Sequence, residues 1–581
     1  MEKSEKLHNL RHSLAHLLAA AVMELYPDTK RTIGPAIDNG FYFDFEFSKP
    51  VSDADLPKIE KVMRKILPKW KGFERSELSA DEAKAEYSEN PYKHELIDEF
   101  TKDGQKVSFY KSGDYSDLCR GGHVENPSKD IDPEAFKLDR VAGAYWRGDE
   151  KNKMLTRIYG LAFETKEELD AYILQREEAE KRDHKKLGKE LDLFVFSELV
   201  GSGLPLWTPK GTILRDVLDN FVWELRQKRG YVKVEIPHIT KKELYEKSGH
   251  WDKFKTELFR ITTREGHEFA MKPMNCPHHI QIFDRRQWSY RELPQRYCNS
   301  TTCYRDEQTG ELSGLSRVRS FTQDDAHVFC RMSQVKEEFL RVWDIVHEFY
   351  NPFGFKMRVR LSLHDPEHSE KYLGDKKSWE HAESVLREIV TGKKADWFEG
   401  MGEAAFYGPK LDFMAKDAIG REWQVATIQL DMNQPERFNL FCINEKGEKE
   451  RLVMIHAAIM GSIDRFLSIL IEHVAGVFPL WLAPVQVKVI PVRENHNDYA
   501  REVFESLRMS DIRAELDDSD ENLGKKVRDA KNNKMPYWIV IGDKEIEAGK
   551  VTLESRDAGQ LGQISKEELI SKLLEEMKNK K

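Results

Sequence analysis

One cysteine and two histidines, far apart in the chain, could together hold a zinc ion. They are Cys276 in MKPMNCPHH, His327 in RVRSFTQDDAHVF and His456 in VMIHAAIMGSIDRF. These residue types supply three ligands of a tetrahedral zinc and leave the fourth position open for a substrate. If the three positions were isolated, a buried cysteine and two core histidines would be the better interpretation.

The same stretches carry arginines that suit the phosphates of ATP, because guanidinium groups bind oxyanions through paired hydrogen bonds. Arg305 ends one expected strand, and Arg317 begins the next, which also carries Phe321 for a purine ring. Arg465 falls in the first turn of an expected helix, where the dipole favours an anion. Each arginine alone would fit a surface ion pair. Together with an open metal, they indicate an enzyme that binds a small polar substrate and activates it with a nucleotide.

A second group of possible ligands lies near the N-terminus. His12 and His16 are one helical turn apart in RHSLAH, and Cys119 and His123 have the same spacing in SDLCRGGH. The two pairs could ligate zinc, or they could form a buried polar cluster without metal. A zinc hydrolase centred on residues 12–123 is therefore one alternative function. However, HxxxH lacks the glutamate of HExxH metalloproteases, and most of the chain would stay unexplained.

Apolar periodicity predicts the elements that position these residues. In the first third of the chain it predicts a helix over 5–25, a turn and strand within 33–47, a helix over 53–70, and a charged, solvated connecting helix over 164–190. In the middle it predicts a helix over 212–229, a strand over 231–236, a strand–loop–strand over 295–330, a helix over 333–350, strands over 404–415 and 421–431, and a strand, a Gly-Ser break and a helix in VMIHAAIMGSIDRFLSILIEHV.

The C-terminal segment after WLAPVQV alternates between helix and strand, which is typical of a small α/β domain. The expected elements are helices over about 497–509 and 521–532, a strand over 512–516 and the apolar run YWIVIG. Five basic residues suggest an RNA-binding track on the second helix, although a solvated face explains them equally well. They are Lys525, Lys526, Arg528, Lys531 and Lys534.

Composition limits the class of protein. The chain has 581 residues, of which 33% are charged and 40% hydrophobic, and a net charge of −9. That length predicts about three or four domains. Six cysteines are too few for a disulfide scaffold. We expect no membrane association, because no run of about 18 apolar residues occurs. MEKSEKLHNL lacks the apolar core of a signal peptide, so we expect a cytoplasmic protein.

These segments resemble the signature motifs of class II aminoacyl-tRNA synthetases. The strand ending at Pro237 is similar to motif 1, residues 298–321 to motif 2 and GSIDRF to motif 3. MNCP, RDEQTGELSGLSRVRSFTQDDAHVF, AFYGPKLDF and MIHAAIMGSIDRF resemble threonyl-tRNA synthetases of the bacterial type in particular. The resemblance covers nearly the whole chain. The small ubiquitin-like domain that begins many members of that family is expected to be missing.

The resemblance implies an α+β multidomain protein. We expect an α+β editing domain over 1–163, a linker helix over 164–190, and a catalytic domain over 191–483 built on the class II antiparallel sheet flanked by helices. An α/β anticodon-binding domain would follow over 484–581. Since motif 1 is a dimer element in the family, the resemblance also implies a homodimer.

The implied activity is that of a threonine–tRNA ligase, which activates L-threonine with ATP and Mg²⁺ and transfers it to tRNA(Thr). Zinc would sort the amino acids: an apolar pocket separates isosteres such as threonine and valine only about 10²-fold, whereas a metal that binds the side-chain hydroxyl rejects valine. Serine also has a hydroxyl, and a missing methyl gives only about 10–200-fold discrimination. A separate N-terminal site that hydrolyses mischarged seryl-tRNA(Thr) is therefore expected.

The resemblance also implies roles for individual residues. It gives one Zn²⁺ per subunit in the catalytic domain, on Cys276, His327 and His456. It implies threonine contacts at Met274, Gln323, Asp325, Tyr407, Lys410, Gln429 and Ser462, and ATP contacts at Arg305, Glu307, Arg317, Phe321, Gln424 and Arg465, with Arg305 and Arg465 catalytic. The editing set is His12, His16, Lys93, Asp117, Cys119 and His123.

Two points stay open in the sequence. A pattern related to the editing set binds zinc in alanyl-tRNA editing proteins, so a second metal is neither implied nor excluded. His278 is not a ligand in the family pattern, but it could contact one. The rival function is a non-catalytic RNA-binding paralogue, against which the retention of Arg305, Arg465 and all three zinc ligands argues.

Overall fold

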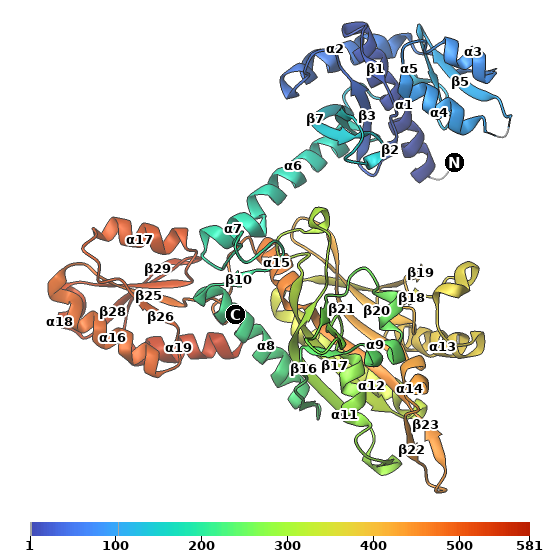
Figure 1. The fold of residues 1–581 in the computed structure, drawn as a ribbon. Helices are drawn as coiled ribbons and strands as arrows, with labels where there is room; N and C mark the ends of the chain where they lie inside the picture. Colours follow the sequence, from blue (N-terminus) through green and yellow to red (C-terminus); the bar gives the residue numbers. More distant parts are fainter. Residues whose placement is uncertain (1–2, 103, 581) are drawn as a thin grey trace. The chain divides into compact units, whose positions relative to one another are not determined.

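The computed structural model describes residues 3–102 and 104–580 and divides into two compact units, Met1–Glu177 and Glu178–Lys581 (Figure 1). Among these described residues, no helix is both long enough and apolar enough to cross a membrane. Family models and the structure together bear out the α+β multidomain class. The predicted domain limits themselves stay predictions.

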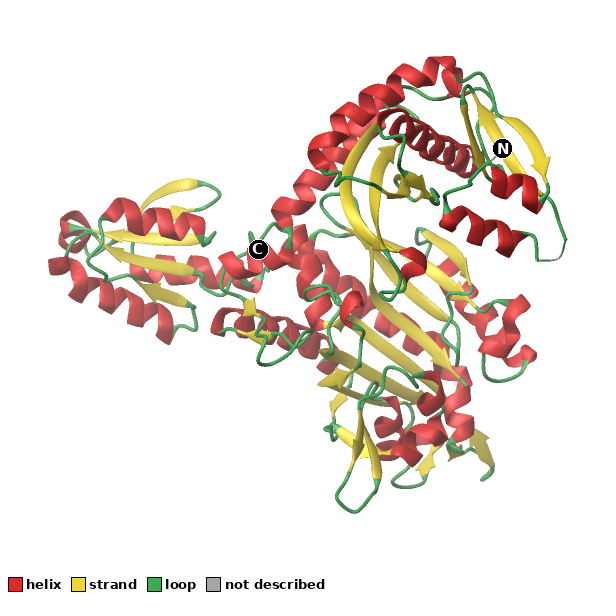
Figure 2. Cartoon of the chain, turned by 45° about the horizontal axis from the view of Figure 1, so that its top comes forward, coloured by secondary structure: helices red, strands yellow, loops and turns green. Residues whose placement is uncertain are grey.

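The N-terminal unit is built around α1 (Lys3–Leu25), whose residues from Leu10 to Val22 are almost all buried. The helix packs on α2 (Leu56–Ile66) and on β3 (Gly40–Glu46) (Figure 2). Its apolar stripe therefore faces one set of neighbours, while its histidine face is covered by other residues. A helix enclosed on both faces holds its side chains in fixed positions.

Two antiparallel sheets complete this unit. The larger has the order β1-β3-β8-β7, with β2 paired to β3, and the smaller has the order β4-β5-β6. Their remaining strands are β1 (Lys30–Arg31), β2 (Ala36–Ile37), β7 (Phe136–Tyr145), β8 (Met154–Ala162), β4 (Glu74–Leu78), β5 (Val107–Ser112) and β6 (Tyr115–Leu118). The other helices are α3 (Ala80–Ala85), α4 (Pro91–Phe100), α5 (Pro127–Asp130) and α6 (Lys166–Arg182), the last of which reaches into the second unit.

An eight-stranded sheet forms the centre of the second unit, in the order β11-β16-β17-β24-β21-β20-β18-β19. All inner pairs are antiparallel, and only the outermost strands at each edge pair parallel to their neighbours. The strands are β11 (Val232–Lys233), β16 (Gln295–Tyr304), β17 (Ser320–Cys330), β24 (Val453–Ser462), β21 (Glu422–Asp431), β20 (Lys410–Lys416), β18 (Lys356–Leu363) and β19 (Trp397–Met401).

The two faces of this sheet have different roles because side chains alternate along a strand. On β17, Ala326 and Val328 belong to the large core formed with α8 (Pro209–Gln227), α12 (Val335–Tyr350), α13 (Lys376–Gly392) and α15 (Ile463–His473). Phe329 faces the opposite side and packs with residues of α11 (Cys276–Phe283). His327 has the same parity as Phe329, so the sheet presents it on the face away from the helical core.

Smaller elements surround the sheet. They are the helices α7 (His184–Glu190), α9 (Lys242–Ser248), α10 (His250–Lys253) and α14 (Asn433–Arg437), and the short strands β9 (Phe194–Val195), β10 (Leu206–Trp207), β12 (Ile239–Lys241), β13 (Arg260–Thr262), β14 (Glu268–Met271), β15 (Trp288–Ser289), β22 (Phe441–Ile443) and β23 (Lys449–Arg451).

The C-terminal segment forms a five-stranded sheet in the order β26-β25-β27-β28-β29. The first three strands are parallel and the last three antiparallel. Its elements are β25 (Val487–Pro491), α16 (Asn497–Met509), β26 (Ala514–Leu516), α17 (Leu523–Asn532), β27 (Tyr537–Ile541), α18 (Asp543–Ala548), β28 (Val551–Ser555), β29 (Gly559–Ile564) and α19 (Lys566–Lys578). The predicted α/β alternation of this segment is confirmed.

Several predicted elements were wrong in extent. The stretch 164–190 is two helices, because Asp183 leaves helical geometry (φ −49°, ψ 119°) and caps α7 by accepting from the Lys185 amide. One face of α7 is not solvated, since His184, Leu187 and Gly188 are buried. The strand expected over 231–236 shrinks to β11, and the predicted strand over 404–415 begins only at Lys410. Helix 53–70 is α-helical only over α2, with a 3₁₀ turn at each end.

Candidate functional site

A single row of paired residues crosses four strands of the large sheet. His327 on β17 pairs with His456 on β24, His456 with Gln429 on β21, and Gln429 with Lys410 on β20. Paired residues project to the same face of a sheet. The antiparallel register therefore gathers four sequence-predicted site residues that are up to 129 positions apart.

The three predicted metal ligands meet at this row. The ligand atoms of Cys276, His327 and His456 all lie within 4.8 Å of one another. His327 Nε2 lies 3.0 Å from His456 Nδ1, and a tetrahedral zinc with bonds of about 2.0–2.1 Å holds two nitrogens roughly 3.3 Å apart. Burial lowers the pKa of His327 well below its usual value, so its neutral ring offers a lone pair. The donor set and spacing fit zinc.

Second hydrogen bonds orient both histidines. His456 Nε2 lies 2.9 Å from Asp431 Oδ2, and His327 Nδ1 lies 2.8 Å from His279 Nδ1. Histidine ligands of metals are usually held in this way by an outer partner. The contact expected of His278 therefore belongs to His279. Both ring nitrogens of His278 lack a hydrogen-bond partner among the described residues.

His250 was not singled out in the sequence, yet it lies beside the cysteine. Its Nε2 is 3.6 Å from Cys276 Sγ, and its Nδ1 is 2.8 Å from Ser248 Oγ. Burial, with Asp325 and Asp431 nearby, raises the pKa of the Cys276 thiol well above its usual range. A ring N–H aimed at the sulfur would favour the thiolate. Only the histidine itself, in SGHW, could have signalled this role.

The predicted threonine residues surround the same row. Asp325 accepts a hydrogen bond from Asn275 Nδ2 at 3.0 Å, and the Tyr407 ring lies 4.9 Å from that of His456. Gln323 pairs with Ser462 across β17 and β24. Met274 packs beside α11. These residues bring carboxylate, amide and hydroxyl groups to one face of the sheet.

The predicted phosphate residues gather around the loop between β16 and β17. The Arg305 guanidinium lies 5.2 Å from the Phe321 ring, and its backbone amide donates to Arg319 O. Arg317 pairs with Glu307 at 2.8 Å. Arg465 lies in the first turn of α15, and its amide donates to the N-cap hydroxyl of Ser462. No carboxylate in the described part of the chain lies within ion-pair distance of Arg465, which leaves it available to an anion.

Gln424 differs from the other predicted ATP residues. Its Nε2 donates to Asp412 Oδ1 at 2.8 Å and its Oε1 accepts from Arg360 at 2.9 Å. Both ends of this amide are therefore bound within a partly buried polar group that also contains Thr427. The Gln424 amide therefore supports its neighbours and is not free to contact a nucleotide.

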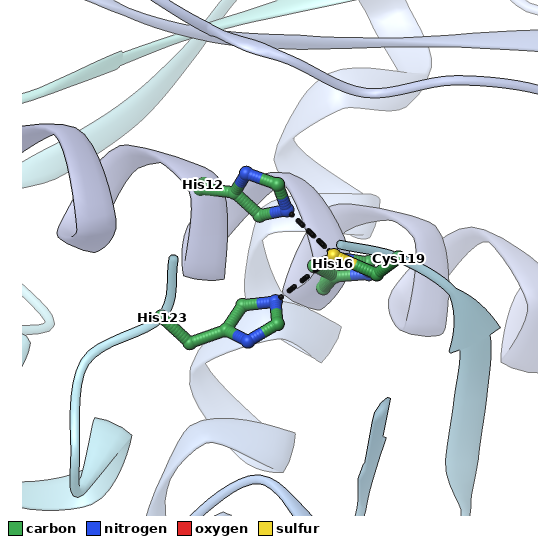
Figure 3. A group of neighbouring side chains, drawn as sticks. All are labelled: His12, His16, Cys119 and His123. Atoms are coloured by element: carbon green, nitrogen blue, oxygen red, sulfur yellow. Dashed lines mark hydrogen bonds between the residues drawn. The ribbon is translucent and has the colours of Figure 1, made fainter. Parts of the chain in front are cut away.

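The second predicted cluster lies entirely in the N-terminal unit (Figure 3). His12 Nε2 lies 3.0 Å from His16 Nε2 and 3.2 Å from Cys119 Sγ, and His123 Nε2 lies 3.4 Å from the same sulfur. The four ligand atoms are within 4.8 Å of one another, so they could also hold a metal. A cavity of about 660 Å³ opens onto His12, His16 and Cys119.

Electrostatics keep this cluster uncharged. Burial, with His8 nearby, lowers the pKa of His12 to about 4, and burial, with His12 nearby, lowers the pKa of His123 to about 3. Burial raises the pKa of the Cys119 thiol to about 11. The cluster therefore offers neutral imidazoles whose free lone pairs can accept a hydrogen bond from a water molecule or bind a metal near neutral pH.

Asp117 binds neighbouring side chains rather than an attacking water. It is 1% exposed, its Oδ1 accepts from Lys93 Nζ at 2.8 Å and from Tyr87 at 2.6 Å, and its Oδ2 accepts from Tyr115 at 2.8 Å. Burial alone would raise the pKa of Asp117, but Lys93 and Arg31 outweigh burial and lower it well below its usual range. Asp117 fixes Lys93 beneath the cavity. Arg31, Tyr87 and Tyr115 were missed because nothing in their spacing links them.

A third group with metal-ligand types, at Asp183, His184 and Glu472, is structural. His184 Nδ1 lies 2.6 Å from Glu472 Oε1, and its Nε2 accepts from the Leu315 amide at 3.0 Å. Both ring nitrogens are used, so none is left for a metal.

The expected basic track on α17 is only partly present. Lys526 is 4% exposed, and its Nζ donates to backbone oxygens of Pro491 and Asp517. Lys534 follows the helix and donates to Ala475 O. The basic residues thus do not form one exposed row, which the helical spacing alone could not reveal.

Three family models match the chain. Residues 254–474 match the tRNA synthetase class II core domain (G, H, P, S and T), and residues 486–576 match an anticodon binding domain. Residues 107–159 match the threonyl and alanyl tRNA synthetase second additional domain. The first two matches fall on the large sheet and the C-terminal sheet, and the third covers Cys119 and His123 of the N-terminal cluster but not His12 or His16.

Curated relatives extend this similarity over nearly the full length. A threonine–tRNA ligase of Deinococcus radiodurans is 49% identical, over 98% of this chain and 89% of the relative. One of Gloeobacter violaceus is 49% identical, over 99% and 93%. Among solved structures, one titled as the RNA binding domain of threonyl-tRNA synthetase from Cryptosporidium parvum has a TM-score of 0.65 and 36% identity, covering 68% of this chain and 98% of that one.

A more distant structure shows the fold alone. Giardia lamblia prolyl-tRNA synthetase in complex with prolyl-adenylate has a TM-score of 0.56 at 16% identity, over 70% of this chain and 80% of that one.

Proposed function

The chain belongs to the family of threonine–tRNA ligases, and on that premise we propose that it activates L-threonine with ATP, transfers it to tRNA(Thr) and hydrolyses seryl-tRNA(Thr) at a separate site. The observation that carries the proposal is the row across four strands, which joins His327 and His456 to the predicted threonine residues Gln429 and Lys410, with the ligand atom of Cys276 on α11 within 4.8 Å of both histidines.

In the activation step, the threonine carboxylate attacks the α-phosphate of ATP and pyrophosphate leaves. Arg305 stabilises the charge that develops on the α-phosphate, and Arg465 binds the terminal phosphate at the N-terminus of α15. Mg²⁺ accompanies the phosphates of ATP. The terminal ribose hydroxyl of the tRNA then attacks the adenylate carbonyl, the bond between carbonyl and phosphate breaks, and AMP leaves with the hydroxyl proton on its phosphate. Positioning and fixed charge carry the activation step. The attacking carboxylate is already ionised, so this step needs no side chain as a base.

Cys276, His327 and His456 would hold one Zn²⁺ per chain. A zinc held there would supply Lewis-acid contacts for the amino group and the hydroxyl of threonine. Asp325 accepts hydrogen bonds from the same polar groups, and Asp431 and His279 keep the two histidines in place. Valine presents a methyl group where the hydroxyl belongs, so the polar groups that recognise the hydroxyl are left unpaired and valine is rejected.

Amino-acid-dependent exchange between ATP and pyrophosphate tests this activity. We expect strong exchange with threonine, weaker exchange with serine, almost none with valine, and loss of exchange when a chelator removes the metal. An absence of exchange with every amino acid, in zinc-replete protein, would contradict the proposal and favour the RNA-binding paralogue.

The N-terminal cluster is proposed to hydrolyse seryl-tRNA. The cavity beside it is lined by Lys106, Arg120 and Glu99, and by Lys93, whose ammonium is already held by Asp117. Lys106 and Arg120 suit the phosphates of a tRNA end. The neutral histidines of the cluster can accept hydrogen bonds from an attacking water and so orient it. We expect Cys119→Ala and His12→Ala variants to accumulate seryl-tRNA while threonine charging is preserved. If neither variant accumulates it, the hydrolytic assignment is wrong.

Two further expectations concern assembly and place. β11 lies at the edge of the large sheet, and Val232 on this strand is 51% exposed. Ile239, seven residues later in the chain, is 47% exposed. An open edge with apolar side chains suits pairing with a second copy. We propose a homodimer in the cytoplasm, with a light-scattering mass twice the 67.9 kDa of one chain. A mass of one chain at micromolar concentration would contradict the dimer.

A further inference from the structure

A fully buried lysine lies beside the proposed threonine pocket without a carboxylate partner. Lys272 follows β14 and is 0% exposed. Its ammonium donates to Asn275 Oδ1 at 3.0 Å and to Thr301 Oγ1 at 2.7 Å. Within residues 3–102 and 104–580, no carboxylate oxygen comes within 4.0 Å of Lys272 Nζ. A charge taken out of water and paired only with neutral acceptors costs free energy, so its retention calls for a reason other than stability.

The ammonium dictates how the Asn275 amide is turned. An ammonium has donors only, so the amide oxygen must face Lys272 and the amide nitrogen must face the other way. On that side, Asn275 Nδ2 donates to Asp325 Oδ2 at 3.0 Å. If the amide were reversed, its oxygen would face a carboxylate and its nitrogen an ammonium. The Lys272 charge therefore selects the one orientation in which Asn275 can bind Asp325.

Asn275 has no competing structural task that would explain its burial. It is 0% exposed and precedes α11, yet its side chain does not cap that helix. Its bonds go to Lys272, Asp325 and the Cys303 thiol, at 3.4 Å from Oδ1. One oxygen of Asp325 is thereby occupied, and the other, Oδ1, lies 3.8 Å from His327 Nε2 on the substrate side.

We propose that Lys272 and Asn275 are positioning residues that hold the Asp325 carboxylate for the polar hydrogens of bound threonine. The inference rests on the proposed function, because it takes Asp325 as a threonine contact. Neither residue touches the substrate. They act by fixing which oxygen of Asp325 is free and where it points.

This role and a merely structural one predict opposite effects on stability. Lys272→Met keeps the length of the side chain and removes the buried charge. Asn275 Oδ1 keeps the Cys303 thiol as a donor, and Thr301 Oγ1 loses one neutral contact, which costs less than the buried charge that the substitution removes. The thermal unfolding midpoint of the Lys272→Met variant should therefore equal or exceed that of the natural chain.

The test is exchange kinetics on the full-length protein loaded with zinc. We expect Lys272→Met to raise the KM for threonine about tenfold, the effect of losing one oriented charge-assisted contact, with the KM for ATP unchanged. Asn275→Asp should raise it further, because the new carboxylate keeps Lys272 paired but faces Asp325. Thr301→Val is the matched control: it removes the other acceptor of the same ammonium and should change the KM for threonine less than about twofold.

Two results would overturn the proposal. One is an unchanged KM for threonine in both Lys272→Met and Asn275→Asp. The other is a fall in the unfolding midpoint of Lys272→Met with equal rises in the KM for threonine and for ATP, which would make Lys272 a structural residue. If the natural chain itself shows no threonine-dependent exchange, the proposed function fails instead, so the two failures are distinguishable.

Discussion

At the scale of single residues, the two histidine clusters differ in the carboxylate that each offers to the second nitrogen of an imidazole ring. His456 Nε2 has Asp431 at 2.9 Å, the arrangement that fixes a metal-ligating imidazole. In the N-terminal cluster, the carboxylate nearest His16 Nδ1 is Asp117, at 4.0 Å, and it is already bound by Lys93. We therefore expect one zinc per chain, at the site that contains Cys276. If metal analysis finds two zinc ions per chain, the second would lie at the site that contains His12.

Removing the partner of His456 should weaken the metal without removing a ligand. In Asp431→Asn the carboxylate charge is lost but the shape is kept, and we expect zinc affinity to fall about 10–100-fold. Competition with a chromogenic chelator measures this. Asp417→Asn is the control, because Asp417 is equally buried but pairs with Arg421. Equal zinc affinity in Asp431→Asn and the natural chain would contradict the assigned partner.

The low pKa of His12 should make the protein less stable in acid. Its folded value of about 4 lies below the usual 6.5, so as the pH falls below about 6.5 the unfolded chain takes up the proton first. Stability is then lost from about pH 6.5 down to about 4. Between pH 7 and pH 5, the unfolding midpoint of the His12→Gln variant should fall less than that of the natural chain. Identical pH slopes in both proteins would contradict the buried neutral state.

At the scale of elements, the loop between β16 and β17 is anchored from outside the sheet. The Leu315 amide donates to His184 Nε2 at 3.0 Å, and Ser316 Oγ lies 2.9 Å from Ser468 Oγ on α15. Gly314 has φ +49°, and a Cβ there would lie 2.3 Å from His184 Nε2. Close contact with α7 thus holds the loop that carries Glu307 and Arg317.

Adding one methyl group to this loop should affect ATP selectively. We expect Gly314→Ala to raise the KM for ATP several-fold in the exchange assay, because the loop must leave His184, while the KM for threonine changes little. Gly310→Ala in the same loop is the matched control, since nothing lies within 4 Å of a Cβ there. Equal behaviour of the two variants would show that the anchor does not position the phosphate residues.

The sequence predicted the helices and strands better than it predicted the side-chain contacts between them. Periodicity placed β17 and α15 because side chains on a strand or helix repeat at fixed intervals, and the matched family models confirm the class II core, the anticodon-binding fold and the additional domain. The contacts of Asp431, His279 and Lys272 were not predicted, because each joins residues that only tertiary packing brings together. The break at Asp183 was missed because it depends on a local cap within an otherwise helical pattern.

At the scale of the whole molecule, each proposed site is built from residues of one unit alone. The metal-ligand residues Cys276, His327 and His456 lie in the second unit, and His12, His16, Cys119 and His123 lie in the first. No residue is shared between the two sets. A substitution at one site should therefore leave the chemistry of the other intact, which is the central claim of the account.

Hydrolysis of preformed seryl-tRNA(Thr) by the Arg305→Ala variant tests that claim most directly. Arg305 lies among the predicted phosphate residues of the second unit, beside Phe321. The account predicts that adenylate formation by this variant is abolished, while seryl-tRNA is hydrolysed at the rate of the natural chain. If hydrolysis falls together with adenylate formation, the two activities share a site and the separation proposed here is wrong.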